Sequence, residues 1–101
     1  MEYHGAFLLE ENDKISNNIN FMPTTYILLC SDSTFYIGST NDLEKRLHQH
    51  NHAKSGAHYT KIRRPVRLVW SEEHPTLAEA RAREVVLKRL TRKEKEELIK
   101  S

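Results

Sequence analysis

The chain has little of the residues and runs that mark several classes of protein. Its 101 residues include a single cysteine, Cys30, so an internal disulfide is excluded and a reducing compartment is indicated. It contains neither a signal peptide pattern nor an apolar run of the length that crosses a membrane. We therefore expect a cytoplasmic protein with no membrane partner.

The length sets the scale of the fold. A chain of this size forms one domain and buries only about 60–65% of its unfolded surface, so its core will be modest. Residues 1–22 show no sustained apolar period and end in an asparagine-rich stretch. We expect residues 1–22 to be an N-terminal extension, either disordered or produced by a start assigned upstream of Met22, and residues 23–101 to form the domain.

Acidic residues are missing from one long segment. Residues 1–22 carry four acidic side chains and one lysine, so the net charge of +2 leaves +5 for residues 23–101. Within the domain, Lys45 to Arg67 holds seven lysines and arginines, four histidines and no acidic residue. Such a segment is either a solvated face or a surface for a polyanion, and a nucleic acid is the natural polyanionic partner.

The strongest local pattern is a β-hairpin. Two short apolar runs, Tyr26–Leu29 and Phe35–Ile37, are joined by the turn-forming residues 31–33. A helix is predicted directly afterwards, capped by Asn41 with Glu44 three positions on. The hairpin carries two phenols, and the helix carries a guanidinium and an imidazole one turn apart, on Tyr26, Tyr36, Arg46 and His50. The pattern therefore directs these four side chains towards one place.

The remainder of the chain predicts one more strand and two more helices. A basic loop is expected at 52–65, a strand at 66–70, a helix from the capping box at Thr76 to about Leu90, and a short last helix from the capping box at Thr91. The fold class is thus α+β: a small three-stranded sheet, mixed or antiparallel and with its order open, flanked by helices.

One carboxylate is predicted to point inward. At about 100° per residue, Glu84 falls among the apolar positions Leu77, Ala80 and Leu87 of its helix. An unpaired buried carboxylate costs several kcal/mol, so Glu84 must be paired, hydrogen bonded or bound to a metal. We expect Glu84 to hold one hard cation, Mg²⁺ or Mn²⁺, with water and phosphate oxygens as the other ligands.

These residues together resemble a known family. The order Tyr26, Tyr36-Ile37-Gly38, Arg46, His50 and Glu84 is similar to the GIY-YIG nuclease superfamily, with only the tyrosine of the first triplet kept. Continuing through Tyr59-Thr60 and Arg63-Arg64-Pro65, the chain resembles the small single-domain bacterial branch, UPF0213-like, over about residues 24–100.

The resemblance implies an endonuclease that hydrolyses phosphodiester bonds in DNA, with DNA repair or processing as the setting. It points to Tyr26 as the general base and Tyr36 as a second phenol, while Arg46 suits contact with phosphate oxygens. His50 is the rival base, because its reference pKa of about 6.5 suits that task better than the ~10 of a tyrosine.

The basic segment supplies the expected nucleic-acid surface. Its candidate contacts are Lys45, Lys54, His58, Tyr59, Lys61, Arg63, Arg64 and Arg67. The sequence leaves several alternatives open: RNA in place of DNA, a monomer or a weak dimer, and a binding module that keeps the nuclease fold without cutting.

Overall fold

A computed structural model describes residues 22–52, 54 and 57–101, so the expected extension lies outside the described residues except for Met22. The fold is α+β, as predicted. Its described elements are the strands β1 (Thr24–Leu29), β2 (Phe35–Thr40) and β3 (Arg67–Glu73) and the helices α2 (Leu43–His52), α3 (His58–Lys61), α4 (Leu77–Lys88) and α5 (Arg92–Lys100).

The three strands form one antiparallel sheet in the order β2-β1-β3. The predicted hairpin is β1 and β2, with Tyr26 opposite Gly38 and Leu28 opposite Tyr36. The central strand β1 is almost completely buried because it is covered on both faces. A register shift between Ile27 and Leu28 marks its pairing with β3.

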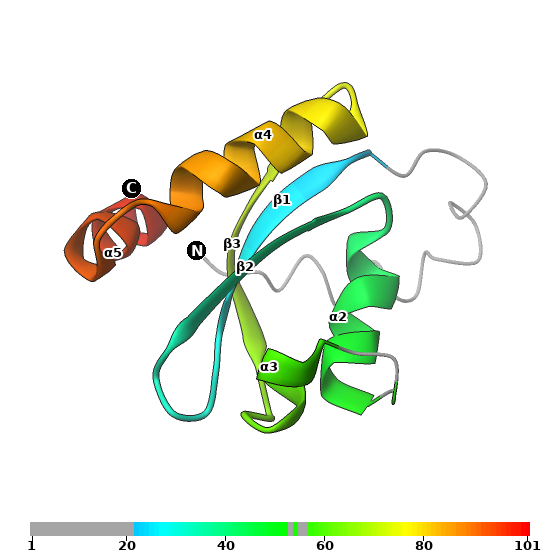
Figure 1. The fold of residues 1–101 in the computed structure, drawn as a ribbon, viewed down its shortest axis with the longest axis vertical. Helices are drawn as coiled ribbons and strands as arrows, with labels where there is room; N and C mark the ends of the chain where they lie inside the picture. Colours follow the sequence, from blue (N-terminus) through cyan, green and yellow to red (C-terminus); the bar gives the residue numbers. More distant parts are fainter. Residues whose placement is uncertain (1–21, 53, 55–56) are drawn as a thin grey trace.

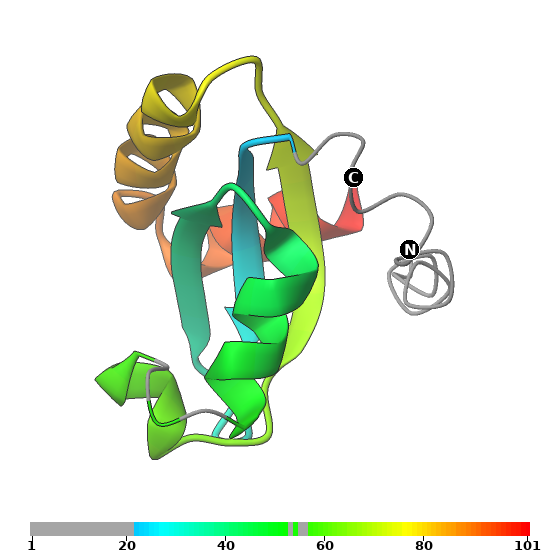
Figure 2. The same ribbon diagram turned by 90° about the vertical axis from the view of Figure 1, so that its right-hand side faces the viewer.

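Helices cover the two faces of the sheet in pairs (Figures 1 and 2). The helices α2 and α3 lie on one face, and α4 and α5 lie on the other. Since side chains alternate along a strand, β1 contributes Tyr26 and Leu28 to the α2 face and Ile27 to the α4 face. Each face has its own cluster of buried side chains.

The helix ends explain where the elements begin. The prediction that Asn41 caps the first helix is wrong by one position: the carboxylate of Asp42 accepts from the backbone N–H of Lys45. The predicted caps at Thr76 and Thr91 are confirmed, and Thr91 forms a complete capping box with Glu94.

One turn of helix, α3, lies where a loop was expected. Its four residues are too few to show an apolar period, so the sequence pattern could not reveal it. Within the part of the chain that the structure describes, every helix is too short or too polar to cross a membrane.

Candidate active site

Tyr26 stands at the centre of the sheet, and Gly38 makes room for its ring. The tyrosine is 1% exposed, and its partner across the hairpin is Gly38. A Cβ atom at position 38 would lie 2.5 Å from the Tyr26 hydroxyl oxygen and 2.7 Å from the adjacent ring carbon. The glycine of the Tyr-Ile-Gly triplet is therefore needed for the ring to lie across β2.

A chain of hydrogen bonds runs from Tyr26 into α2 and α3. The tyrosine hydroxyl lies 2.8 Å from Nε2 of His50, which is fully buried. The other ring nitrogen, Nδ1, lies 2.8 Å from Oγ1 of Thr60, and this hydroxyl is 3.0 Å from the carbonyl oxygen of Ala57. Thr60 was not among the predicted site residues, because its place in the Tyr59-Thr60 pair of the family resemblance does not indicate a chemical role.

Burial keeps both members of the Tyr26–His50 pair neutral. Desolvation, followed by the nearby Tyr36, raises the pKa of Tyr26, although Arg46 opposes the rise through a hydrogen bond and its charge. Desolvation, followed by the charges of Arg46 and Arg64, lowers the pKa of His50 to about 4. At neutral pH a phenol therefore faces an uncharged imidazole.

Two further predicted residues lie beside this pair. The ring of Tyr36 packs edge-on against His50 with 5.1 Å between the centroids, and Tyr36 also neighbours Tyr59 at 5.9 Å. Arg46, half-buried on α2, donates from Nη1 to the side-chain oxygen of Gln49 over 3.0 Å. The structure thus brings Tyr26, Tyr36, Arg46 and His50 together as predicted from the hairpin and helix pattern.

Glu84 reaches the same region from α4, which packs on β1 and β2. One carboxylate oxygen accepts from the Ser39 hydroxyl over 2.6 Å, and the other lies 2.8 Å from Nζ of Lys88. Its side chain is 20% exposed, and its charge adds to the rise in the pKa of Tyr26. Glu84 is therefore hydrogen bonded and paired, two of the states that its inward position predicted.

The ligands available near Glu84 suit a cation that is held by few protein atoms. Among the described residues, no three His, Cys, Asp or Glu side chains gather at a distance that would enclose a metal ion. Mg²⁺ characteristically keeps several waters and takes one or two carboxylates, so the single carboxylate of Glu84 fits it. In the present structure this carboxylate is paired with Lys88, whose pKa it raises through the hydrogen bond between them.

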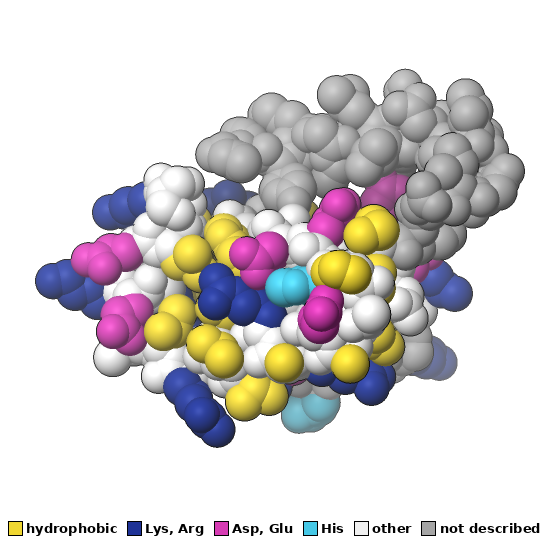
Figure 3. Space-filling model, turned by 90° about the horizontal axis from the view of Figure 1, so that it is seen from above, with side chains coloured by type: hydrophobic (Ala, Val, Ile, Leu, Met, Phe, Trp, Pro, Cys, Tyr) yellow, Lys and Arg dark blue, Asp and Glu magenta, His cyan; other side chains and the backbone are white. Residues whose placement is uncertain are grey.

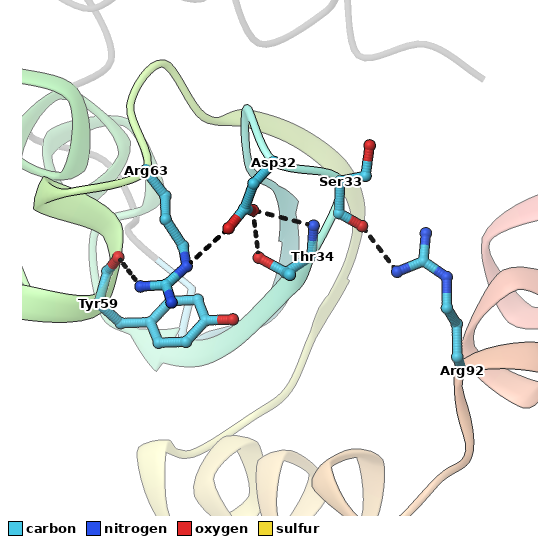
Figure 4. A network of polar contacts seen from close by, with 6 residues as sticks. All are labelled: Asp32, Ser33, Thr34, Tyr59, Arg63 and Arg92. Carbon is cyan, nitrogen blue, oxygen red and sulfur yellow. Dashed lines mark hydrogen bonds and ion pairs between the residues drawn. The ribbon is translucent and has the colours of Figure 1, made fainter.

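Two arginines of the predicted nucleic-acid surface have structural partners. Arg63 pairs with Asp32 over 2.9 Å at the hairpin turn and stacks 3.8 Å above the ring of Tyr59 (Figure 4). Arg64 donates to the carbonyl oxygens of His50 and Gln49 in the last turn of α2. Both arginines therefore help to hold α2, α3 and the hairpin turn in place.

The other predicted contacts lie on the surface. Tyr59 is 36% exposed, and five basic side chains from α2, α3 and the segments after them are exposed: Lys45, Lys54, His58, Lys61 and Arg67. The α4 side has a different character: on the part formed by described residues, acidic, basic and apolar side chains are mixed (Figure 3). The exposed cations of the acid-free segment thus gather around α2 and α3.

Comparison with known proteins decides the family. The family described as the GIY-YIG catalytic domain matches residues 22–97. The chain belongs to the GIY-YIG family. A UPF0213 protein of Bacillus velezensis is 53% identical over 74 residues, which are 73% of this chain and 74% of that protein. The UPF0213 protein YazA of Bacillus subtilis is 51% identical over 71 residues, which are 70% of this chain and 71% of that protein.

Solved structures of GIY-YIG relatives have the same fold. A solution NMR structure of an E. faecalis protein is 43% identical, has a TM-score of 0.55, and covers 78% of this chain and 83% of that one. A UPF0213 protein from Bacillus halodurans is 38% identical with a TM-score of 0.50, over 77% of this chain and 82% of that one. The family match implies a nuclease with a nucleic-acid substrate.

Proposed function

We propose that this protein is a divalent-metal-dependent endonuclease that hydrolyses phosphodiester bonds in DNA, in repair or processing. The observation that carries the proposal is the buried hydrogen bond between Tyr26 and His50, with Arg46 beside it. A phenol next to a neutral imidazole can move a proton, and a guanidinium can bind the phosphate at which that proton is needed.

The contact of 2.8 Å between the Tyr26 hydroxyl and Nε2 of His50 supports a mechanism in which the two rival bases act in series. Tyr26 takes a proton from the attacking water while its own hydroxyl proton passes to Nε2 of His50, and the resulting hydroxide attacks phosphorus. Because its pKa is raised, Tyr26 is not a phenolate in the free protein, so the two transfers are coupled. The phenol contacts the water, and the imidazole holds the proton.

Bound phosphate makes this transfer easier. With a pKa of about 4, protonating His50 at pH 7 costs about 4 kcal/mol in the free protein. Part of that cost comes from the positive charge of Arg46, which a phosphate on the guanidinium neutralises. Substrate binding therefore raises the basicity of His50 when it is required.

Glu84 is the residue that would hold the cation. A cation held there would supply positive charge to offset the negative charge that develops on the phosphoryl oxygens and on the departing 3′-oxygen. Lys88, which pairs with Glu84 over 2.8 Å, would place a second positive charge beside the cation. Tyr36, beside His50, supplies a second phenol that can orient the water or the phosphate.

One observation favours a second candidate, a nucleic-acid-binding module that does not cut. Tyr26 is 1% exposed and His50 is fully buried, so almost none of the surface of the pair contacts water. A buried pair of this kind can equally serve to pack the α2 face. Against this, every catalytic position of the family pattern after the first triplet is filled.

Cutting and binding of the same DNA separate the two functions. We expect the wild type to nick plasmid or branched DNA with Mg²⁺ or Mn²⁺ and not with excess chelator. Glu84→Gln removes the charge and keeps the shape, so it should abolish nicking while retaining DNA affinity. Glu79→Gln, an exposed position on the same helix, is the matched control and should cut normally. A wild type that binds several DNA and RNA forms but cuts none with either metal would leave the binding module as the function.

A further inference from the structure

Thr60 has an unusual position for a residue of a one-turn helix. It is fully buried, although its neighbours Tyr59 and Lys61 are exposed. Its bond to the carbonyl of Ala57, three positions back, is an ordinary one for a helical threonine. The contact that calls for an explanation is the other one, between its hydroxyl and Nδ1 of His50.

The protons in the hydrogen bonds that link Tyr26, His50, Thr60 and Ala57 can be assigned from the chemistry of the four groups. The carbonyl oxygen of Ala57, which also accepts from the backbone N–H groups of Thr60 and Lys61, can only accept hydrogen bonds, so the contact of 3.0 Å assigns the single hydroxyl proton of Thr60 to Ala57. Oγ1 of Thr60 must then accept from Nδ1 of His50, which carries the proton. A neutral imidazole has only one N–H, so Nε2 is bare and accepts from the hydroxyl of Tyr26.

We propose that Thr60 is a positioning residue that holds His50 in the Nδ1-protonated tautomer and so keeps Nε2 free to take the proton of Tyr26. Its value for catalysis rests on the function proposed above, while its effect on the tautomer does not. Without the Thr60 oxygen, an Nδ1 proton would be buried without a hydrogen-bond partner, which is unfavourable. The imidazole then favours the Nε2-protonated form, which cannot serve as a base towards Tyr26.

The last group in this series of hydrogen bonds, the carbonyl of Ala57, limits where the proton can go. The carbonyl of Ala57 accepts a hydrogen bond but does not take up a proton, so the chain leads no further. A proton received by Nε2 of His50 therefore stays on the imidazolium and returns through Tyr26. The other groups that face His50 are Tyr36 from β2, Arg46 from α2 and Arg64 from the segment before β3. None of them competes for Nδ1, which Thr60 contacts.

The tautomer can be read directly from ¹⁵N NMR of the His50 ring at neutral pH. We expect the wild type to show a protonated Nδ1 and a bare Nε2. Thr60→Val keeps the shape and removes the oxygen, so it should shift the ring towards the Nε2-protonated form. Thr60→Ser keeps the hydroxyl and should restore the wild-type pattern, which a purely structural role of the side chain does not predict.

Each outcome decides the proposal. A wild type with a protonated Nε2 overturns it even if Thr60→Val fails to fold. A folded Thr60→Val with an unchanged tautomer overturns it as well. If the wild type has a protonated Nδ1 but cuts no nucleic acid, the proposed nuclease function fails and the positioning role stands. If the wild type cuts, Thr60→Val should lose at least ~10-fold in kcat with DNA binding unchanged, and Thr60→Ser should regain it.

Discussion

The two faces of the sheet are built from different chemistry. On the α4 face, the buried hydrophobic cluster is the aliphatic Ile27, Ile37 and Leu87, beside the buried Thr25, whose hydroxyl donates to the carbonyl oxygen of Ala80. On the α2 face, the fully buried set includes Tyr26, His50 and Thr60, joined through their polar atoms. Apolar burial stabilises a fold directly, whereas a buried hydrogen bond contributes only about 1 kcal/mol net. Apolar side chains are buried on both faces, but the α2 face also carries the Tyr26–His50 pair to which the proton transfer is assigned, while Glu84 comes from α4.

The charges follow the same division. The exposed lysines of the acid-free segment 45–67 lie on and beside α2 and α3, while the α4 side shows both signs mixed among apolar side chains (Figure 3). A phosphate backbone is attracted by the first arrangement and gains little from the second. The α2 face, which carries the hydrogen-bonded residues Tyr26, His50 and Thr60, is therefore also the face where we expect DNA to bind.

The largest expected effect is on stability, in the aliphatic cluster of the α4 face. Leu87 is 1% exposed, so Leu87→Ala should lower the free energy of unfolding by about 2–5 kcal/mol. Urea unfolding measures this loss. At temperatures where the variant is folded, we expect the cutting rate per folded molecule to change little. A variant that is stable but inactive would contradict the division between the faces.

Gly38→Ala should instead lower the rate of DNA cutting. The added Cβ would lie 2.5 Å from the Tyr26 hydroxyl, so the ring must leave His50 or the strand must move. A misplacement of about 1 Å in a catalytic group costs about 100-fold in rate, and we expect at least that loss in a nicking assay. Ser31→Ala, in the exposed hairpin turn, is the control. Normal cutting by Gly38→Ala would show that the ring position is not needed.

The pH dependence of stability tests the environment of His50. Its pKa is about 4 in the folded protein and 6.5 ordinarily, so the unfolded chain binds more protons between those values. Stability should therefore be fully present above pH 6.5 and fall as the pH drops towards 4, by at most about 3 kcal/mol. Urea unfolding across this window should show a smaller fall for His50→Gln. Parallel curves for the two proteins would mean that His50 is not buried as a neutral ring.

The smallest effect concerns the salt dependence of DNA binding. Lys54 and Lys61 are exposed, and each phosphate contact contributes about 0.9 to the slope of log affinity against log salt. Lys54→Gln with Lys61→Gln should flatten the slope by up to ~2 units. The double control Lys93→Gln with Lys100→Gln, on α5 of the other face, should leave it unchanged. Equal flattening by both pairs would remove the binding site from the α2 face. Arg63 and Arg64 are less suitable, because they also stabilise the fold.

Sequence reasoning reached the parts of this molecule that depend on local order. The hairpin, the helix after it and the inward carboxylate follow from spacing, so Tyr26, Arg46 and Glu84 could be placed before any coordinates. The strand order and Thr60 could not, because they depend on how separate segments pack. The partners of Arg63 and Arg64 were missed for the same reason: a run of positive charge does not show which side chains turn back onto the protein.

The central claim is that the hydrogen-bonded residues Tyr26 and His50 on the α2 face, with Thr60 behind them, perform the proton transfer. The most direct test is the single-turnover cutting rate of Tyr26→Phe with saturating Mg²⁺ or Mn²⁺, beside His50→Ala and with DNA affinity measured in parallel. We predict that Tyr26→Phe and His50→Ala both bind DNA normally and that each loses at least ~100-fold in rate, because the coupled transfer needs both groups. A Tyr26→Phe protein that cuts at the wild-type rate would contradict the account, and a loss confined to His50→Ala would make the imidazole the base that contacts water.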